Sequence, residues 1–491
     1  MSASKPSSPV LPVAEAADID AAVRLPVLVL LAFAILWLLT ASALGLVAAI
    51  KLTRPDFLAS CEWLTFGRVY PAALNALAYG WGVSAGLAVA LWLMARLSRA
   101  VLPGGGLLVV AAVCWNVGVK LGILGILAGW SNSVPWLEMP RQVMPFLLVA
   151  YVCMAAWVVG ALRAGSSPRL YVSQWWVLAA LFWLPWLLTA AGAMLFFAPV
   201  RGTVQSVVAA WYAHGLLALW FAPLGLGLVY YLLPKLLGKP IRAYYLAPFG
   251  FWFYALFSAW AGAARLADGP VPAWTQAAGA IASFMLLLPV AVIAVNLFGS
   301  FLGGGLAALG RGVVLRFAAV AALFFVLSTL LYVAMALPGV AAITRLTWFA
   351  AASDYAVIYG VFSFAVFGAV YYLAPRLVGR EWPFASLIRA HFWLALAGLV
   401  LAGVSLSLGG LQQGRELTNA KIPFADVTQH TLPYLQAATL AGALLLLGHL
   451  AFAVNFVKLV LCPRHRAASA AAPVPASLLA APELELEVHA S

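Results

Sequence analysis

Residues 230–240 read Tyr-Tyr-Leu-Leu-Pro-Lys-Leu-Leu-Gly-Lys-Pro, and residues 371–379 read Tyr-Tyr-Leu-Ala-Pro-Arg-Leu-Val-Gly. The second segment follows the first by 141 residues (371 − 230), and a weaker version, Leu-Trp-Leu-Met-Ala-Arg-Leu, occupies residues 91–97. Each segment ends an apolar run at a basic residue, as helices do at a membrane surface. The pattern predicts three related membrane-spanning helices. A simpler interpretation is that aromatic, proline and basic residues commonly end helices at this interface.

The rest of the chain is equally apolar. Of 491 residues, 65% are hydrophobic and 8% are charged, whereas a soluble domain carries about 25% charged residues. A span of the bilayer needs about 20 apolar residues, and the runs of that length number twelve. They cover residues 25–50, 70–98, 105–129, 142–163, 171–199, 203–237, 244–265, 272–305, 313–337, 344–378, 386–410 and 429–461. We predict an all-α integral membrane protein of twelve transmembrane helices, of which the second, sixth and tenth are alike.

The basic residues predict how the chain crosses the membrane. The N-terminal segment and the segments after even-numbered spans hold 17 of the 27 Lys and Arg residues, against 9 on the other side. Since cytoplasmic loops are enriched in Lys and Arg, we expect both termini to be cytoplasmic. We therefore assign the net charge of +13 to loops and expect no nucleic acid partner. The predicted organisation is a cytoplasmic tail (1–24), a membrane domain (25–461) and a disordered Ala/Pro-rich cytoplasmic tail (462–491).

Ionisable residues inside the predicted spans are functional candidates by default. His214 lies about 11 residues into the sixth span, and Lys120 and Asp354 lie at similar depths in the third and tenth. They are either three separately satisfied polar residues or one buried polar layer in which Lys120 pairs with Asp354. Copper and iron sites normally gather several imidazoles or thiolates. No second histidine lies near His214 in the sequence, so we predict no metal site and no catalytic residue.

Several motifs around His214 resemble subunit I of the haem-copper oxidase superfamily, most closely its C-family (cbb-type) cytochrome c oxidases. The matching residues are Trp211, Tyr212, His214, Tyr230, Tyr231, Pro234, Lys235, Pro240, Trp252, Trp260, Ala261, Gly262, Pro272, Trp274, Gln276, Gly279, Ser283, Met285, Pro289 and Asn296. The resemblance implies three arcs of four helices in pseudo-threefold symmetry, which agrees with the repeat. It also implies haem b groups and a copper ion that reduce oxygen to water in a respiratory chain. The implied location is the bacterial inner (cytoplasmic) membrane.

The resemblance also implies which positions should hold these groups, and most carry other residues. His214 matches the first copper ligand. The other implied ligand or active-site positions are Ala73, Ser258, Ala264, Arg265, Ser353 and Tyr355. Alanine and serine are not axial donors for haem iron, and an arginine would repel a copper ion. We therefore expect no bound cofactor, and Lys120, Asp354 and Arg265 are candidates for new polar pairing in the vacated core.

The predicted function is that of a redox-inactive, cytochrome c oxidase subunit I-like protein. It would serve as a paralogous, scaffold or assembly subunit, with membrane lipid and other oxidase subunits, including haem c subunits, as partners. Two alternatives remain open. The first is a functional oxygen or nitric oxide reductase subunit with unusual haem ligation. The second is an ion or proton transporter that uses the Lys120, His214 and Asp354 layer.

Overall fold

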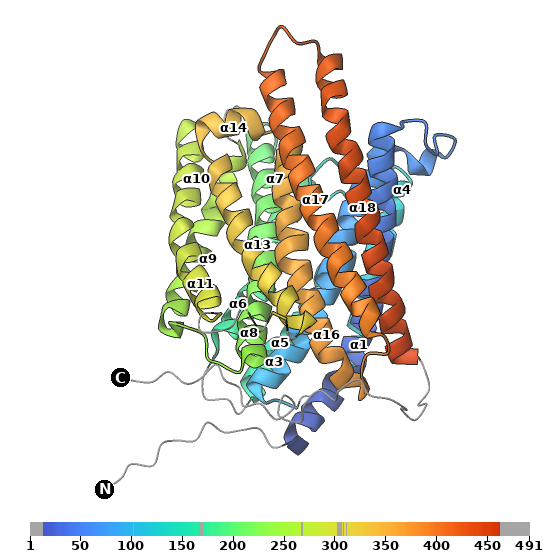
Figure 1. Cartoon of the computed structure of the whole chain (residues 1–491), viewed down its shortest axis with the longest axis vertical. Helices are drawn as coiled ribbons and strands as arrows, with labels where there is room; N and C mark the ends of the chain where they lie inside the picture. The colour runs from blue at the N-terminus through green and yellow to red at the C-terminus, as the bar shows by residue number, and fades with distance from the viewer. Residues whose placement is uncertain are drawn as a thin grey trace.

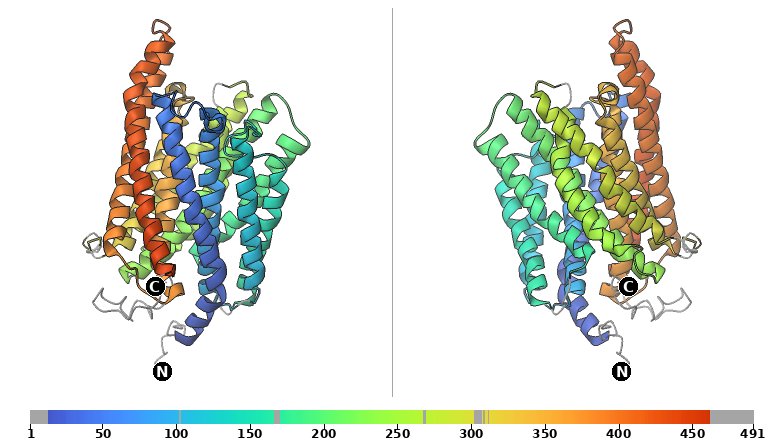
Figure 2. Two further views of the ribbon diagram at one scale, coloured as in Figure 1. Left: turned by 90° about the vertical axis from the view of Figure 1, so that its right-hand side faces the viewer. Right: turned by 90° about the vertical axis from the view of Figure 1, so that its left-hand side faces the viewer.

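The computed structural model describes residues 13–101, 103–165, 170–266, 269–301, 307, 309–310 and 312–461, and their regular elements are all helical. The main helices run side by side in one bundle (Figures 1 and 2). They are α1 (Val13–Thr53), α2 (Phe66–Asn75), α3 (Ser84–Ser98), α4 (Gly105–Leu127), α5 (Val143–Ala164), α6 (Val172–Gly192), α7 (Thr203–Gly215), α8 (Ala222–Leu237), α9 (Ala247–Ala261), α10 (Ala273–Met285), α11 (Leu287–Gly299), α13 (Val313–Met335), α14 (Pro338–Thr344), α15 (Trp348–Tyr355), α16 (Phe364–Val378), α17 (Ala385–Leu417) and α18 (Phe424–Leu461).

Eleven helical segments within the described ranges are long and apolar enough to cross a membrane. The remaining predicted span, 244–265, corresponds to α9 and a following 3₁₀ segment, η6 (Gly262–Leu266). Helix α9 has 15 residues, fewer than the about 20 that a straight span requires. The all-helical membrane architecture is confirmed, and the count of twelve stays a prediction.

The boundary of the predicted N-terminal tail differs from the structure. Helix α1 begins at Val13, twelve residues before the predicted span at residue 25. Ile19 and Val23 are buried, because this first part of α1 packs against the bundle instead of standing free. The predicted tail 462–491 lies outside the described residues.

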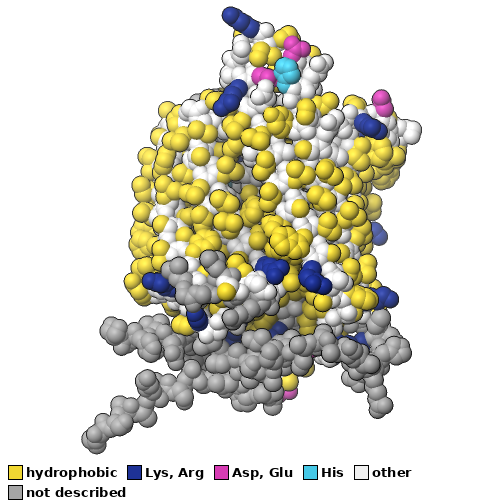
Figure 3. Space-filling view, in the orientation of Figure 1, with side chains coloured by type: hydrophobic (Ala, Val, Ile, Leu, Met, Phe, Trp, Pro, Cys, Tyr) yellow, Lys and Arg dark blue, Asp and Glu magenta, His cyan; other side chains and the backbone are white. Residues whose placement is uncertain are grey.

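The three helices that carry the repeated sequence form the interior of the bundle. The most apolar stretch is 100% buried in Phe66–Ser98, 94% in Thr203–Leu237 and 83% in Trp348–Val378, against 33 to 50% in the other eight spans. The surrounding helices expose their outer sides, which are largely apolar in Figure 3. An apolar outer face suits lipid, and basic side chains lie near the lower end of the same view.

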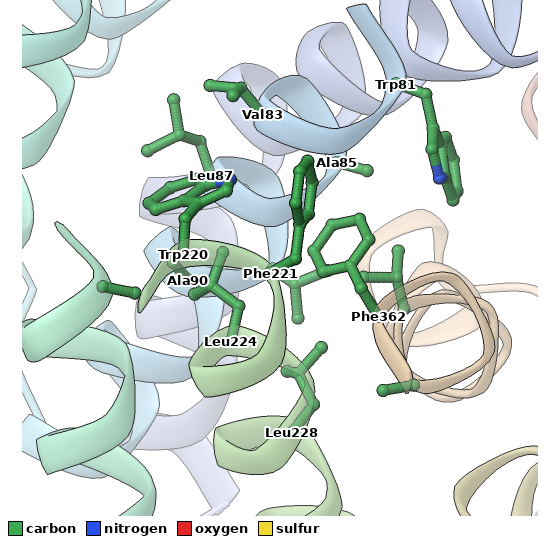
Figure 4. Packing of buried hydrophobic residues seen from close by; sticks show 14 of the residues in the cluster. Trp81, Val83, Ala85, Leu87, Ala90, Trp220, Phe221, Leu224, Leu228 and Phe362 are labelled. Atoms are coloured by element: carbon green, nitrogen blue, oxygen red, sulfur yellow. The ribbon is translucent and has the colours of Figure 1, made fainter. Parts of the chain in front are cut away.

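Each central helix contains a π-helical segment at an equivalent position. These segments are η2 (Ala76–Val83), η4 (Leu216–Phe221) and η7 (Ala356–Ser363), and their starts lie 140 residues apart (216 − 76 and 356 − 216). Such segments commonly mark functional parts of a helix. The rings of Phe221 and Phe362 meet edge to face at 4.9 Å (Figure 4). Gly82 faces them, and a Cβ there would lie 2.4 Å from the Phe221 ring. The three helices therefore touch where their π segments converge.

Candidate functional site

An arginine–aspartate ion pair joins η6, the segment after α9, to the interior helix α15. Arg265, on η6, contacts Asp354, on α15, through Nη2 to Oδ1 at 2.5 Å and Nη1 to Oδ2 at 3.4 Å. Both oxygens of the carboxylate are engaged, which is the strong, bidentate arrangement of this pair. The side chains are 25% and 16% exposed. The pair is therefore largely shielded and sits in the wall of a cavity.

His214, on α7, lies beside this pair and is hydrogen-bonded on one ring nitrogen. Its Nε2 is 3.1 Å from the Ser258 carbonyl oxygen. A carbonyl oxygen only accepts, so Nε2 carries the hydrogen and donates it. The imidazole also packs on the Tyr332 ring at a centroid distance of 4.9 Å. Nδ1 is therefore the nitrogen that keeps a free lone pair.

Two neighbouring cavities have the ion pair in their walls. The larger, of about 430 Å³, is bordered by Ala264, Arg265, Ser353 and Asp354. The smaller, of about 40 Å³, is bordered by His214, Ser258 and the same Arg265, Ser353 and Asp354. Six positions singled out in the sequence thus border these two cavities: His214, Ser258, Ala264, Arg265, Ser353 and Asp354. The lining of the larger cavity is mostly apolar.

A third cavity, of about 100 Å³, is lined by residues of α1, α2, α15, α17 and α18. Ala73 and Tyr355 both border it, with small residues such as Gly45 and Gly442 around them. The ring of Tyr355 stacks on Tyr359 at 5.4 Å. The two positions that the family resemblance assigns to one haem therefore do face a common space.

Lys120 does not belong to the polar layer, which corrects the predicted Lys120–Asp354 pair. Its side chain is exposed on α4, whereas Asp354 pairs with Arg265. Helix α4 is apolar on all sides, so the depth of Lys120 along the helix did not reveal which side it faces. A lysine seven residues before the helix end at Leu127 can extend its amine toward the membrane surface.

The side chains around these cavities do not fit a haem iron or a copper ion. Haem iron takes axial His, Met, Cys or Tyr donors, and copper sites use several imidazole or sulfur ligands. The smaller cavity beside the ion pair offers one imidazole, His214, next to a guanidinium cation. The third cavity offers phenols, among them Tyr355, and a phenolate can ligate ferric haem, but Ala73 supplies no second axial donor there. Across the described residues, no three His, Cys, Asp or Glu side chains gather at one point.

The other histidines inside the bundle lie elsewhere. His391 and His449, on α17 and α18, are fully buried and border none of the three cavities. The His391 Nδ1 is 2.9 Å from the Tyr371 hydroxyl, and the His449 Nδ1 is 2.8 Å from the Ser42 hydroxyl. Both rings are packed among aromatic side chains. They therefore belong to the packed core, and His449 contacts Ser42 and Tyr359, which border the third cavity.

Sequence reasoning missed two residues of the site. Tyr332, on α13, borders both cavities beside the ion pair. It donates its hydroxyl hydrogen to the Ala261 carbonyl oxygen at 2.8 Å. Arg345 borders the larger cavity just after α14. Neither residue has a sequence signal, because a tyrosine in an apolar span and an arginine in a loop are both common.

Glu138, in the loop between α4 and α5, is hydrogen-bonded to the last residue of α2. The Asn75 side chain donates to Glu138 Oε2 at 2.5 Å. Burial raises the pKa of the Glu138 carboxyl to about 7, and the hydrogen bonds from Asn75 and from nearby backbone groups oppose this rise. Glutamate unperturbed by a protein titrates at about 4.3. The folded protein therefore holds this proton more tightly than the unfolded chain does.

We expect Glu138 to make stability depend on pH. Between about pH 4.5 and pH 7 the folded state binds more protons than the unfolded state, so the free energy of unfolding falls as pH rises through this window. The drop is at most about 3.5 kcal/mol, at 1.36 kcal/mol per pKa unit. Thermal unfolding of the wild type and the Glu138→Gln variant from pH 4 to 8 measures it. The two curves should converge at low pH, separate from about pH 4.5 and differ most above pH 7, with the variant more stable; parallel curves would contradict the assignment.

Comparison with known proteins identifies the class of protein that this bundle represents. A cytochrome c oxidase subunit 1 homolog of Agrobacterium tumefaciens (strain T37) is 26% identical over 442 residues, which cover 87% of this chain and 82% of the relative. The Cbb3-type cytochrome c oxidase subunit CcoN1 of Stutzerimonas stutzeri is 26% identical over 434 residues, 86% of this chain and 91% of the relative. The protein is thus a cytochrome c oxidase subunit I-like, multi-pass membrane protein.

The family pattern described as "Cytochrome C and Quinol oxidase polypeptide I" matches residues 26–444, and the chain belongs to this family. A solved heme-copper terminal oxidase dimer matches the structure with a TM-score of 0.71 at 14% identity, covering 91% of this chain and 85% of the other. At this identity the match supports the fold alone. The predicted resemblance to the haem-copper oxidase superfamily and its cbb-type members is confirmed.

Proposed function

We propose that this protein is a redox-inactive member of its family that serves as a paralogous, scaffold or assembly subunit of a respiratory oxidase. The observation that carries the proposal is the Arg265–Asp354 ion pair. Arg265 stands at a position that the family resemblance assigns to a copper ligand, and Asp354 lies between the two positions that it assigns to haem ligands. A mutually neutralising pair supplies no free donor for a metal.

Electrostatics supports the same conclusion. The Arg265 guanidinium is permanently charged, and it borders the same small cavity as His214. A copper ion beside His214 would meet this positive charge across a space of low dielectric constant, where repulsion is strong. An arginine at a position assigned to a copper ligand, neutralised by Asp354, therefore opposes the binding of a metal ion in this cavity.

The proposal extends to arrangement and partners. Three groups of four helices, each containing one central helix with its π segment, would retain the surfaces by which such a subunit contacts lipid and other oxidase subunits, including haem c subunits. We place the protein in the bacterial inner membrane with both termini cytoplasmic, as the excess of basic residues on that side indicates. Under this proposal the membrane domain holds partner subunits in place and transfers no electrons.

The test is an optical and metal analysis of the purified full-length protein. We expect no α band of b-type haem after dithionite reduction, and less than about 0.1 iron or copper per chain by mass spectrometry of metals. A cbb-type oxidase purified in the same detergent is the control that must show both. Stoichiometric iron with a b-type α band would overturn the proposal and favour a functional reductase with unusual ligation.

The transport alternative is tested on the same preparation. Since Lys120 is exposed, a buried layer would consist of His214, Arg265 and Asp354. Proton or ion flux into liposomes that Asp354→Asn abolishes, at equal amounts of folded protein, would contradict a purely structural role. Co-purification of haem c subunits with the tagged protein, without such flux, is the expected result.

A further inference from the structure

Four arginines surround a hollow between the start of α1 and the ends of α3 and α16. Figure 1 shows these helix ends at the lower end of the bundle. The hollow has a volume of about 470 Å³, and its lining includes Arg24, Arg96, Arg376, Arg380 and Asp20. Asp20 is the one acidic residue among them, so the lining carries an excess of three positive charges. The hollow lies on the opposite side of the membrane domain from the Arg265–Asp354 pair, and the proposed function does not use it.

Three aromatic side chains pack against one another beside this hollow. Trp92, Tyr231 and Tyr372 come from the three repeated helix ends, and their ring centroids are 5.7, 6.1 and 6.2 Å apart, with the rings edge to face. Arg96 follows Trp92 by one helical turn and lies 5.9 Å from its ring, and Arg376 lies 3.6 Å from the ring of Tyr372. These contacts hold the guanidinium groups in fixed positions.

The two central arginines retain buried donors without a partner. Arg96 donates from Nη1 to the Ala16 carbonyl oxygen at 3.0 Å and lies 3.7 Å from the Asp20 carboxylate. Arg376 donates from Nη1 to the carbonyl oxygen of Tyr372. Arg96 Nε and Arg376 Nη2 are buried and have no hydrogen-bond partner among the described residues. Unpaired buried guanidinium nitrogens are unfavourable, so the described residues do not use the full hydrogen-bonding capacity of these two arginines.

Asp20 cannot satisfy these donors alone. It already accepts a hydrogen bond from Trp92 Nε1 at 2.9 Å and pairs with Arg96. The missing group should therefore be an anion with several acceptor oxygens. Phosphate fits this description, since its oxygens match the planar fork of arginine.

We propose that this hollow binds the phosphate of an acidic phospholipid headgroup. The hollow lies where the membrane-spanning helices α3 and α16 end, at residues 98 and 378, which is the depth of lipid headgroups. Basic pockets between helix ends are typical binding sites for anionic lipid headgroups. The lipid chains would lie along the apolar outer surface of the neighbouring helices.

Native mass spectrometry of the full chain in mild detergent tests this proposal. The wild type should retain one phosphatidylglycerol or cardiolipin per chain after delipidation, and the double variant Arg96→Gln with Arg376→Gln should bind the same lipid at least tenfold more weakly. Arg389→Gln is the matched control, because Arg389 is an exposed basic residue near the start of α17 that does not line the hollow. Equal retention by the double variant and the control would overturn the proposal.

A second measurement uses only the wild type, so that misfolding of a variant cannot obscure the result. Added phosphatidylglycerol should raise the unfolding temperature by several degrees more than the same concentration of phosphatidylcholine does. Equal effects of the two lipids would contradict the proposal. A third measurement with inorganic phosphate at 10 mM distinguishes a lipid phosphate from a free phosphate ion. Stabilisation by inorganic phosphate with no retained or stabilising lipid would assign the hollow to a free anion and reject the lipid.

Discussion

Replacing Asp354 by asparagine is expected to lower the free energy of unfolding by about 3 kcal/mol, because it leaves the Arg265 guanidinium unpaired in a largely buried site. Asparagine keeps the size of the side chain and removes only the charge. The carboxylate currently receives both Nη atoms of Arg265, and Arg265 Nε has no partner among the described residues. The amide of the variant keeps only one oxygen acceptor and carries no charge, so the guanidinium would lack a counterion.

The matched variant removes both charges. A buried ion pair replaced by apolar residues of similar volume is often neutral or more stable, so Arg265→Met with Asp354→Leu should recover stability to within about 1 kcal/mol of the wild type. Thermal or detergent-induced unfolding of the wild type, Arg265→Met, Asp354→Leu and the double variant, arranged as a double-mutant cycle, measures the coupling. A coupling near zero would show that Arg265 and Asp354 do not stabilise each other. The proposal of a redox-inactive protein would then lose its main support.

Adding a methyl group at Gly414 is expected to destabilise the upper part of the bundle even more strongly. A Cβ at Gly414 would lie 1.7 Å from the Ile343 carbonyl oxygen, and one at Gly410 would lie 2.2 Å from the Phe349 backbone nitrogen. These are backbone atoms of α14 and α15, which cannot rotate away as a side chain would. Small residues allow membrane helices to approach this closely. We expect Gly414→Ala to cost at least about 3 kcal/mol, at the upper end of overpacking effects.

Gly403→Ala is the control for this prediction. Gly403 lies on the same helix, α17, and a Cβ there would meet nothing within 4 Å. Alanine forms helices better than glycine by about 0.8–1 kcal/mol, so this variant should be as stable as the wild type or slightly more stable. The yield of monodisperse protein and its unfolding temperature are the measurements. Equal behaviour of the two variants would mean that α17 and α14 are not in backbone contact.

Much of the fold followed from local sequence. Long apolar runs predicted the membrane helices, since a bilayer requires about 20 apolar residues and internal backbone hydrogen bonds. The repeated segments at residues 91–97, 230–240 and 371–379 pointed to the three helices that prove to be most buried. Fifteen-residue α9 is the exception, because hydropathy does not reveal where an α-helix becomes a 3₁₀ turn.

The candidate site followed only in part. Positions assigned through the family resemblance, such as Ala73 with Tyr355 and His214 with Arg265, do border common cavities. Lys120 and Arg265 were both candidates for polar pairing with Asp354, and the partner is Arg265. The basic hollow at Arg96 and Arg376 was not predicted at all, although both residues belong to the repeat that indicated the fold.

The sequence by itself determined the class of protein, the positions of the spans, their repeat, and the identity of the residues at the family's ligand positions. These depend on composition and spacing along the chain. Only the tertiary structure decided which side of a helix a polar residue faces. Lys120 and Asp354 lie at similar depths, but α4 is apolar around its whole circumference, so no periodicity marks an inner side. Packing turns Lys120 outward and brings Arg265 to Asp354 across 89 residues of sequence, because rotation about a helix axis is set by neighbouring helices.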